Sequence, residues 1–239
     1  MTIKQAISHP WEVSTDQALE IQRSLRGRVI ELPPPERPAI VAGIDVNVNQ
    51  GQTRAAVVLL SFPQLVPFEV AKAERPETFP YVPGLLAFRE GPVVLQALQR
   101  LTETPDVLIF DAQGVAHPRR MGLATHLGIL VDMPSIGCAK SRLCGEHTEP
   151  DSKKGNWTRL YDGDEVIGAV VRTREDVKPV FVSIGHRMNL DMAVQLVVDC
   201  APNYRLPETT RWAHRIARGA SLPRNSQPGP RQPQSATTQ

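Results

Sequence analysis

The sequence has little of what marks secreted or membrane-spanning proteins. Its 239 residues include only three cysteines, Cys138, Cys144 and Cys200, and none of them belongs to a CxxC pair. This small, odd number argues against a disulfide scaffold and favours a reducing compartment. No apolar run approaches the length of a membrane span, and the N-terminus lacks the hydrophobic region of a signal peptide. We therefore expect a cytoplasmic protein without a membrane partner.

An excess of either charge is also missing. The 27 Lys and Arg residues nearly balance the 25 Asp and Glu residues, which gives a formal net charge of +2. Such a balance neither requires nor excludes a nucleic acid as partner. The position of individual charged residues is therefore more informative than their sum.

Strand and helix patterns alternate along most of the chain. Strands are expected at residues 40–48, 54–62, 65–73, 107–110, 135–139, 165–173 and 179–184. Helices are expected over residues 15–26, from Pro92, from His117, over 190–200 and from Pro207 to Gly219. This order predicts an α/β fold with a mixed β-sheet flanked by helices.

The composition changes near the C-terminus. Residues 221–239 are rich in Pro, Gln, Ser and Thr and contain one large aliphatic residue, Leu222. Such a segment cannot bury enough apolar surface to order itself. We expect a single domain over residues 1–220, followed by a disordered tail.

Acidic residues lie on two of the buried strands. Asp45 interrupts a β-branched apolar run, and Asp111 follows the apolar residues 107–110. One such aspartate is most simply a helix cap, but two suggest a compensating cation, because an unpaired buried charge is costly. Glu90 completes a set of three carboxylates, although a place near the N-terminus of the Pro92 helix would also explain it. Carboxylates of this kind bind Mg²⁺, which can promote phosphodiester hydrolysis.

Basic residues follow several of the expected strands or begin helices. They are His117, Arg119, Arg120, Lys140, Arg142, His186 and Arg187. For any one of them, a scattered surface position is an equally good interpretation. Taken as a set, we expect them to converge on one edge of the sheet, where a basic rim would attract a polyanionic substrate.

Two further residues have two interpretations each. Tyr81 lies between Pro80 and Pro83, so its loop either presents the ring to a base stack or folds over the sheet as a hydrophobic cover. His214 lies opposite the apolar stripe of the last helix, where it is either simply exposed or placed to act on a metal or a water. The residues alone leave both choices open.

Seven segments follow one another in an order that is specific to one family. They are GIDV at Asp45, PYVPGLLAFRE ending at Glu90, FDAQG around Asp111, HPRRMGLATHLGILVD from His117, IGCAKSRLCG through Lys140, GHR ending at Arg187, and YRLPETTRWAH ending at His214. Over roughly residues 14–218, the chain resembles the endonuclease V family of deoxyinosine-directed repair nucleases. The resemblance implies a ribonuclease-H-like fold.

The resemblance implies a catalytic role for six residues. Asp45 and Asp111 would bind Mg²⁺, for which Mn²⁺ can substitute, and Glu90 would complete the acidic centre. His214 falls where relatives carry histidine or aspartate at the metal site. His117 and Lys140 fall at basic positions near the scissile phosphate.

The resemblance also implies a set of nucleic-acid-binding residues. Tyr81 would be the wedge that enters the duplex beside the lesion. The pocket for the flipped base would include Gly84, Leu86, Gly122 and Leu123. Arg119 and Arg142 are further nucleic-acid-binding candidates. One departure is Ala112-Gln113, where relatives commonly carry Gly-His or a similar pair.

The implied activity is hydrolysis of the second phosphodiester bond on the 3′ side of deoxyinosine in DNA, leaving 3′-hydroxyl and 5′-phosphate ends. We expect the protein to be a monomer. Three alternatives remain. The first is a nuclease of the excision-repair incision type, which lacks the PYVPG segment. The second is a catalytically silent module that recognises deaminated bases, and the third is an inosine-directed ribonuclease.

Overall fold

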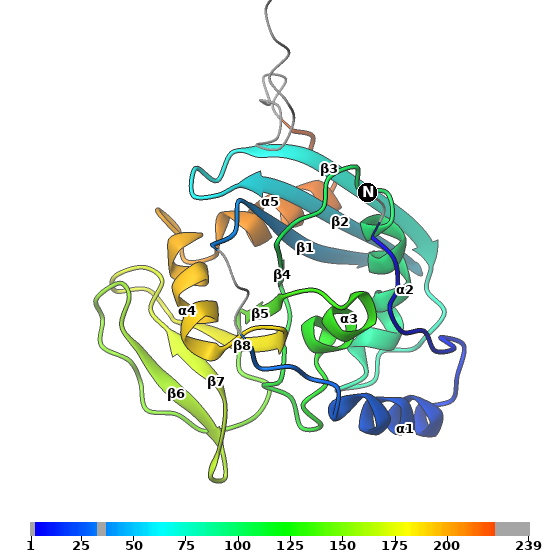
Figure 1. The fold of residues 1–239 in the computed structure, drawn as a ribbon, viewed down its shortest axis with the longest axis horizontal. Helices are drawn as coiled ribbons and strands as arrows, with labels where there is room; N and C mark the ends of the chain where they lie inside the picture. The colour runs from blue at the N-terminus through cyan, green and yellow to red at the C-terminus, as the bar shows by residue number, and fades with distance from the viewer. Residues whose placement is uncertain (1–2, 33–36, 223–239) are drawn as a thin grey trace, which may run out of the picture.

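One mixed β-sheet of eight strands organises the protein, with helices on both faces (Figure 1). The computed structural model describes residues 3–32 and 37–222. The strands are β1 (Ile40–Asn49), β2 (Gln52–Ser61), β3 (Pro67–Pro76), β4 (Val107–Phe110), β5 (Ser135–Ala139), β6 (Trp157–Asp162), β7 (Glu165–Val171) and β8 (Val180–His186). They lie in the order β3-β2-β1-β4-β5-β8-β7-β6. The predicted α/β class with a mixed, helix-flanked sheet is confirmed.

The helices divide between the two faces of the sheet. They are α1 (Thr15–Arg26), α2 (Leu86–Leu98), α3 (Leu123–Val131), α4 (Leu190–Asp199) and α5 (Glu208–Ala217). Helices α1, α2 and α3 pack with Ala42 and Ile44 of β1 in one apolar cluster, whereas α4 and α5 pack with Val41 in another. Because strand residues alternate between faces, Asp45 points to the side of α4 and α5.

Strand direction fixes which ends of the strands meet. Strands β1, β4 and β5 are parallel neighbours, so their carboxyl ends share one edge of the sheet. Strand β8 pairs antiparallel with β5, and its last residue, His186, lies opposite Ser135 at the start of β5. The end of β8 therefore lies at the other edge.

Helix α2 begins earlier than the sequence predicts. It starts at Leu86, so Pro92 lies inside it and not at its first position. Leu85, Ala87 and Phe88 are buried, and Leu85 and Phe88 pack with Phe79 in a small apolar cluster. This burial outweighs the poor helix propensity of the later Gly-Pro pair. Glu90 consequently lies in the helix interior, where the expected interaction with a helix N-terminus does not apply.

Two other predictions about element bounds are wrong. Helix α3 begins at Leu123 and not at His117, because residues 117–122 form a loop whose polar groups bond to other segments. Strand β6 is absent from the predicted set, since Leu160 is its one buried residue and the sequence there shows no apolar alternation. Hairpin β6–β7 forms the end of the sheet seen at the lower left of Figure 1.

The C-terminal prediction is only partly covered by the described residues. Residues 223–239 of the expected tail lie outside them, whereas Leu222 packs against the apolar cluster under α4 and α5. Among the described helices, none combines the length and apolar character needed to cross a bilayer. The three cysteines are free, and Cys138 and Cys200 are buried.

Candidate active site at the carboxyl edge of the sheet

The two strand-borne aspartates meet at the shared edge of β1 and β4. Ile44 pairs with Phe110 in the parallel register, so Asp45 and Asp111 follow at the same level on neighbouring strands. Both continue the alternation that points Val41 and Ile109 toward α4 and α5. The sequence therefore places two carboxylates side by side on one face.

Helix α5 brings His214 to this pair of aspartates. The helix lies so close to β1 that a Cβ at Gly43 would stand 1.9 Å from the backbone oxygen of Thr209. Only glycine permits this approach. With α5 packed this closely on β1, the Nδ1 of His214 donates a hydrogen bond to Oδ2 of Asp45 over 2.8 Å.

Asp45, Asp111 and His214 form a candidate metal site. Each offers one ligand atom, and the three atoms lie within 4.8 Å of one another, the one such group in the described part of the chain. Burial and the neighbouring Asp111 charge raise the pKa of Asp45, against the opposing effects of His214 and Lys140. The Nζ of Lys140, which follows β5, forms an ion pair with Oδ2 of Asp111. The site is thus a crowded carboxylate pair with a lysine at its rim.

Glu90 is not one of the three clustered ligands, but it lies close enough to Asp45 and Asp111 for their charges to affect its pKa. Burial raises the pKa of its carboxyl to about 8, and the charges of Asp45 and Asp111 add to the shift, whereas Arg89 opposes it. A carboxyl group that burial keeps uncharged at neutral pH is a candidate for a role in catalysis. The structure therefore brings all three predicted carboxylates into one electrostatic unit.

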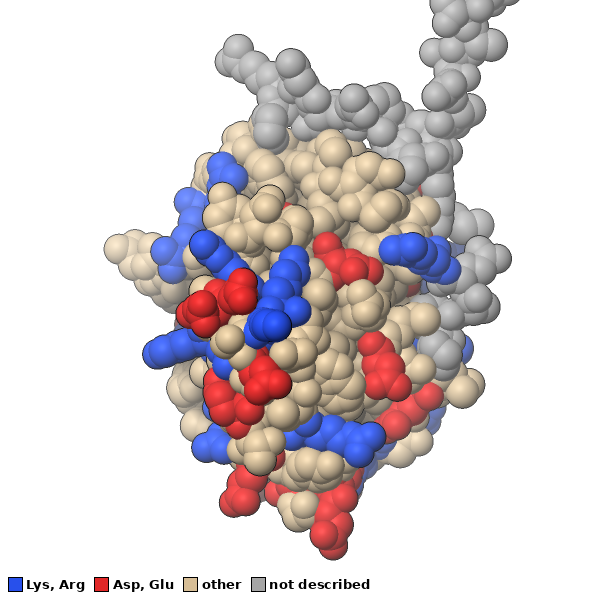
Figure 2. Space-filling view, turned by 90° about the vertical axis from the view of Figure 1, so that its left-hand side faces the viewer, with Lys and Arg blue, Asp and Glu red and all other residues tan. Residues whose placement is uncertain are grey.

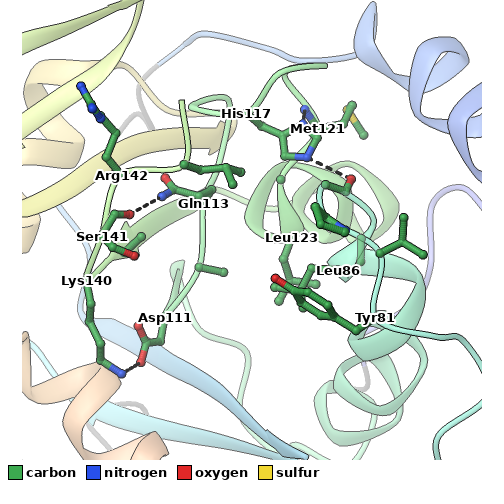
Figure 3. Close-up of a pocket in the computed structure, with 18 residues that line it drawn as sticks. Tyr81, Leu86, Asp111, Gln113, His117, Met121, Leu123, Lys140, Ser141 and Arg142 are labelled. Atoms are coloured by element: carbon green, nitrogen blue, oxygen red, sulfur yellow. Dashed lines mark hydrogen bonds and ion pairs between the residues drawn. The ribbon is translucent and has the colours of Figure 1, made fainter. Parts of the chain in front are cut away.

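A pocket of about 320 Å³ opens beside Asp111. Its lining includes nine of the candidate site residues predicted from the sequence: Tyr81, Gly84, Leu86, Asp111, His117, Gly122, Leu123, Lys140 and Arg142. Figure 3 shows Tyr81 and Leu86 on one wall and Lys140, Ser141 and Arg142 on the opposite wall. Tyr81 is 67% exposed, so its loop does not bury the ring as a cover over the sheet.

His117 uses both ring nitrogens inside the protein. Its Nε2 donates to the backbone oxygen of Gly84 over 3.0 Å (Figure 3), and its Nδ1 accepts from the backbone N–H groups of Arg119 and Met121. Burial lowers the pKa of His117 to about 4, with the nearby arginine charges adding to the effect. His117 is therefore a neutral imidazole whose hydrogen bonds join two loops.

The expected basic rim forms only in part. Lys140 and Arg142 line the pocket, whereas Arg119 is not among its lining residues and donates to the backbone oxygen of Gly84. The prediction is wrong for His186 and Arg187, which pair with Asp132 at the opposite edge because β8 runs antiparallel to β5. The direction of a strand cannot be read from its composition.

Arg120 also leaves the rim. Its guanidinium is 2.9 Å from Asp162 and 2.6 Å from Glu165 on the β6–β7 hairpin. The face at that end of the molecule carries Lys, Arg, Asp and Glu side chains intermixed (Figure 2). It therefore offers no continuous basic surface to a polyanion.

Other pocket residues escape sequence reasoning. Gln113 lines the pocket and donates from Nε2 to the backbone oxygen of Ser141 over 2.9 Å (Figure 3). Arg205 does not line the pocket, but its Nη2 donates to the backbone oxygen of Lys140 over 2.6 Å. A side chain that bonds to a distant backbone group leaves no pattern in the sequence. For Gln113, the one signal is that Ala112-Gln113 departs from the pair that relatives commonly carry.

Fold and site together define an α/β protein with a candidate metal centre beside a pocket. The family model of Endonuclease V matches residues 23–215. Endonuclease V of Roseiflexus sp. is 49% identical over 220 residues, which is 92% of this chain and 99% of the relative. That of Methanothrix thermoacetophila is 49% identical over 214 residues, covering 90% and 95%. The chain belongs to the endonuclease V family, and it is a nuclease.

Solved structures agree with this assignment. Endonuclease V from Streptomyces avermitilis superimposes with a TM-score of 0.84 at 42% identity, over 91% of this chain and 96% of that one. Endonuclease V from Ciona intestinalis, solved with a 24mer DNA containing an inosine followed by a ribo-adenosine, gives 0.75 at 28% identity over 85% and 95%. The predicted family and fold are confirmed.

Proposed function

We propose that the protein is a Mg²⁺-dependent DNA repair endonuclease that recognises deaminated bases, chiefly deoxyinosine. It hydrolyses the second phosphodiester bond on the 3′ side and leaves 3′-hydroxyl and 5′-phosphate ends. The observation that carries this proposal is that Asp111 belongs both to the three-ligand cluster and to the lining of the pocket. A base held in the pocket would therefore bring its neighbouring phosphates to the carboxylates.

The donor set fits a hard divalent cation. Two carboxylates are what Mg²⁺ commonly takes from a protein, with water and substrate oxygens completing its shell. A cation would also offset the burial and the repulsion from Asp111 that raise the pKa of Asp45. His214 donates to Asp45 and so orients that carboxylate. The bound ion would polarise the phosphodiester and lower the pKa of a water molecule.

The remaining charged residues act on the phosphate and on protons. Lys140 at the rim, 42% exposed, can exchange its contact with Asp111 for a phosphate oxygen. Glu90, whose carboxyl has a pKa of about 8, can hold or release a proton at physiological pH. These are the groups that we assign to catalysis beside Asp45, Asp111 and His214.

The pocket and Tyr81 account for selection of the lesion. The exposed Tyr81 ring can fill the gap that a flipped nucleotide leaves in the duplex. Flipping costs least for a mispaired base, which favours a deaminated adenine. Leu86, Gly122 and Leu123 give the pocket an apolar wall for the base, and Arg142 adds a positive charge at its entrance. The inosine in the DNA bound to the Ciona relative supports this substrate class.

A ribonuclease activity on inosine-containing RNA is a second candidate. It is favoured by the ribo-adenosine that follows the inosine in the DNA bound to the Ciona relative. We also propose a cytoplasmic monomer; the three free cysteines suit a reducing compartment. Light scattering of the purified protein tests the monomer.

A nicking assay tests the main proposal. An end-labelled duplex with one deoxyinosine is incubated with enzyme and either Mg²⁺ or a chelator, beside an unmodified duplex and an inosine-containing RNA. We expect a Mg²⁺-dependent nick one nucleotide beyond the inosine. Binding without a cut would favour the silent recognition module, and cleavage of RNA alone would favour the ribonuclease.

A further inference from the structure

A fully buried glutamine on α1 bonds to both loops that frame the pocket. Gln22 has no exposed surface, and its amide has three partners. Its Nε2 donates to the backbone oxygen of Gly84 over 3.0 Å and to that of Met121 over 3.1 Å. Its Oε1 accepts from Nε of Arg119 over 2.6 Å. The amide thus has partners for both of its N–H groups and for its oxygen.

The backbone oxygen of Gly84 is the point where these segments converge. It accepts from Gln22, from Nε2 of His117 over 3.0 Å and from Nη2 of Arg119 over 2.7 Å. Gly84 ends the Tyr81 loop (residues 80–84), whereas the histidine and the arginine belong to the His117 loop (residues 117–122). Gly84 has φ +79°, and a Cβ there would stand 2.6 Å from the Arg119 guanidinium. A side chain at this position would therefore strain the backbone and displace the Arg119 guanidinium from the junction.

We propose that Gln22 is a positioning residue for lesion recognition, which locks the Tyr81 loop to the His117 loop. The inference rests on the proposed function, since it concerns how the wedge and the pocket act on one nucleotide. Tyr81 enters the duplex from one loop, and the flipped base lies against Gly122, which belongs to the other loop. The two actions match only if the loops keep a fixed separation, and Gln22 bonds to both.

The contacts of Gln22 separate this role from ordinary packing. A buried amide on a helix could be replaced by an apolar side chain at little cost if it served the core alone. Here its removal leaves the Met121 oxygen and the Arg119 Nε without the partner that the structure gives them. The two loops are then joined at the Gly84 oxygen by His117 and Arg119 alone, and we expect lesion binding to weaken.

The test compares Gln22→Met with Leu25→Met. Methionine keeps the length of the glutamine side chain and the helix propensity while removing every hydrogen bond. Leu25, three residues further along α1, is buried in the core without lining the pocket, so Leu25→Met controls for a change in α1 packing. Affinity is measured in chelator for duplexes with and without deoxyinosine. We expect Gln22→Met to lose about 10-fold in preference for the lesion and Leu25→Met to lose none.

A double-variant cycle with Tyr81→Ala shows whether Gln22 acts through the wedge. Tyr81→Ala alone should weaken lesion binding by about 10-fold to 100-fold with an unchanged melting temperature, since base–aromatic stacking is worth about 1–3 kcal/mol. Gln22→Met combined with Tyr81→Ala should lose no more than Tyr81→Ala alone. A single-turnover rate at saturating enzyme close to wild type would place the effect of Gln22 in binding.

Three results would overturn the assignment. One is an unchanged lesion preference in Gln22→Met, and another is a fully additive double variant. The third is an equal loss in Leu25→Met. If Gln22→Met does not fold, Gln22→Glu takes its place, since it keeps the acceptor for Arg119 and loses both donors; the same loss of preference is expected. If wild type itself does not prefer the inosine duplex, the proposed function fails first, and a wild-type preference with unaffected variants rejects Gln22 alone.

Discussion

The acidic site and the loop junction at Gly84 lie on opposite sides of one pocket and are built on opposite physical principles. At the junction, each polar group of Gln22 has a partner within the protein, and the neighbouring His117 is neutral. At the acidic site, burial and the crowding of like charges raise the pKa values of Asp45 and Glu90. The hydrogen bonds of the Gln22 amide are all satisfied within the protein, whereas we expect the carboxylates to be stabilised when a cation binds.

This difference separates recognition from chemistry. Preorganised hydrogen bonds keep a binding surface in one conformation and lower the ordering cost of binding. Crowded carboxylates bind a cation because it relieves their repulsion, at the expense of stability without it. Variants on the two sides should therefore fail in different assays.

The largest effect is expected for Asp45→Ala. Loss of a carboxylate from the metal cluster should lower cleavage of the inosine duplex by about 1,000-fold or more, because metal assistance is worth several kcal/mol in the transition state. Lesion binding in chelator should stay within about 3-fold of wild type, because the pocket is intact. The matched control is Asp164→Ala on the exposed β6–β7 turn. Nicking by Asp45→Ala at the wild-type rate would remove this residue from the mechanism.

A smaller effect is expected for Glu90→Gln, which should raise stability at pH 8 and lower the rate of cleavage. The carboxyl of Glu90 has a pKa of about 8 in the folded protein, against 4.5 for an unperturbed glutamate. A raised pKa favours folding below pH 4.5, and this contribution is lost as the pH rises through 8. Without metal, wild type should lose about 3 kcal/mol of unfolding free energy between pH 5 and pH 8 relative to Glu90→Gln.

Urea unfolding in chelator at both pH values measures this difference. Glu90→Gln should be the more stable protein at pH 8 and the slower enzyme with Mg²⁺. Equal stability of the two proteins at pH 8 would show that Glu90 ionises normally in the folded state.

The smallest effect is expected for lesion binding as a function of pH. Burial keeps the pKa of His117 at about 4, below the usual 6.5 of histidine, so the imidazole stays neutral between pH 6 and pH 8. His117 should therefore add no pH dependence to the affinity for the inosine duplex over this range. Glu90→Gln, which removes the carboxyl with a pKa of about 8, should bind that duplex equally at pH 6 and pH 8 in chelator, measured by fluorescence anisotropy. A step near pH 6.5 that disappears in Glu90→Gln/His117→Gln would mean that His117 is protonated when DNA binds.

Below pH 6.5 the recognition side should lose stability instead. Burial lowers the pKa of His117 to about 4 and that of the buried His126 to about 3. As the pH falls, both side chains therefore bind protons in the unfolded chain at a higher pH than in the folded one. A depressed pKa gives stability that is present above 6.5 and lost as the pH falls toward the folded values. The two sides of the pocket thus respond to pH in opposite directions.

The sequence reveals the acidic site better than the junction. Asp45 and Asp111 follow β-branched runs, and such runs predict both the strands and their carboxyl ends. Gln22 has no such signal, because its partners lie 62, 97 and 99 residues away in the chain. The spacing of Ala18, Gln22 and Leu25 places the glutamine on the buried face of α1, but the loops that it bonds to are known only from the structure.

The wrong predictions share a cause of the same kind. His186 and Arg187 follow a predicted strand as Lys140 does, and only the pairing direction of β8 sends them to the other edge. Helix α2 begins at Leu86 because tertiary burial stabilises a turn that precedes a Gly-Pro pair. Composition predicts the elements, but their direction and exact bounds depend on contacts between distant segments.

Gly84 sets a limit for anyone who would redesign base selectivity by laboratory evolution. Its backbone oxygen accepts three hydrogen bonds, and its positive φ would strain any other residue. A library over the pocket should keep glycine at this position and vary Val82, Pro83 and Leu86 around it. New specificities would then be searched around a fixed backbone position, with the carboxylates that cut the strand left untouched.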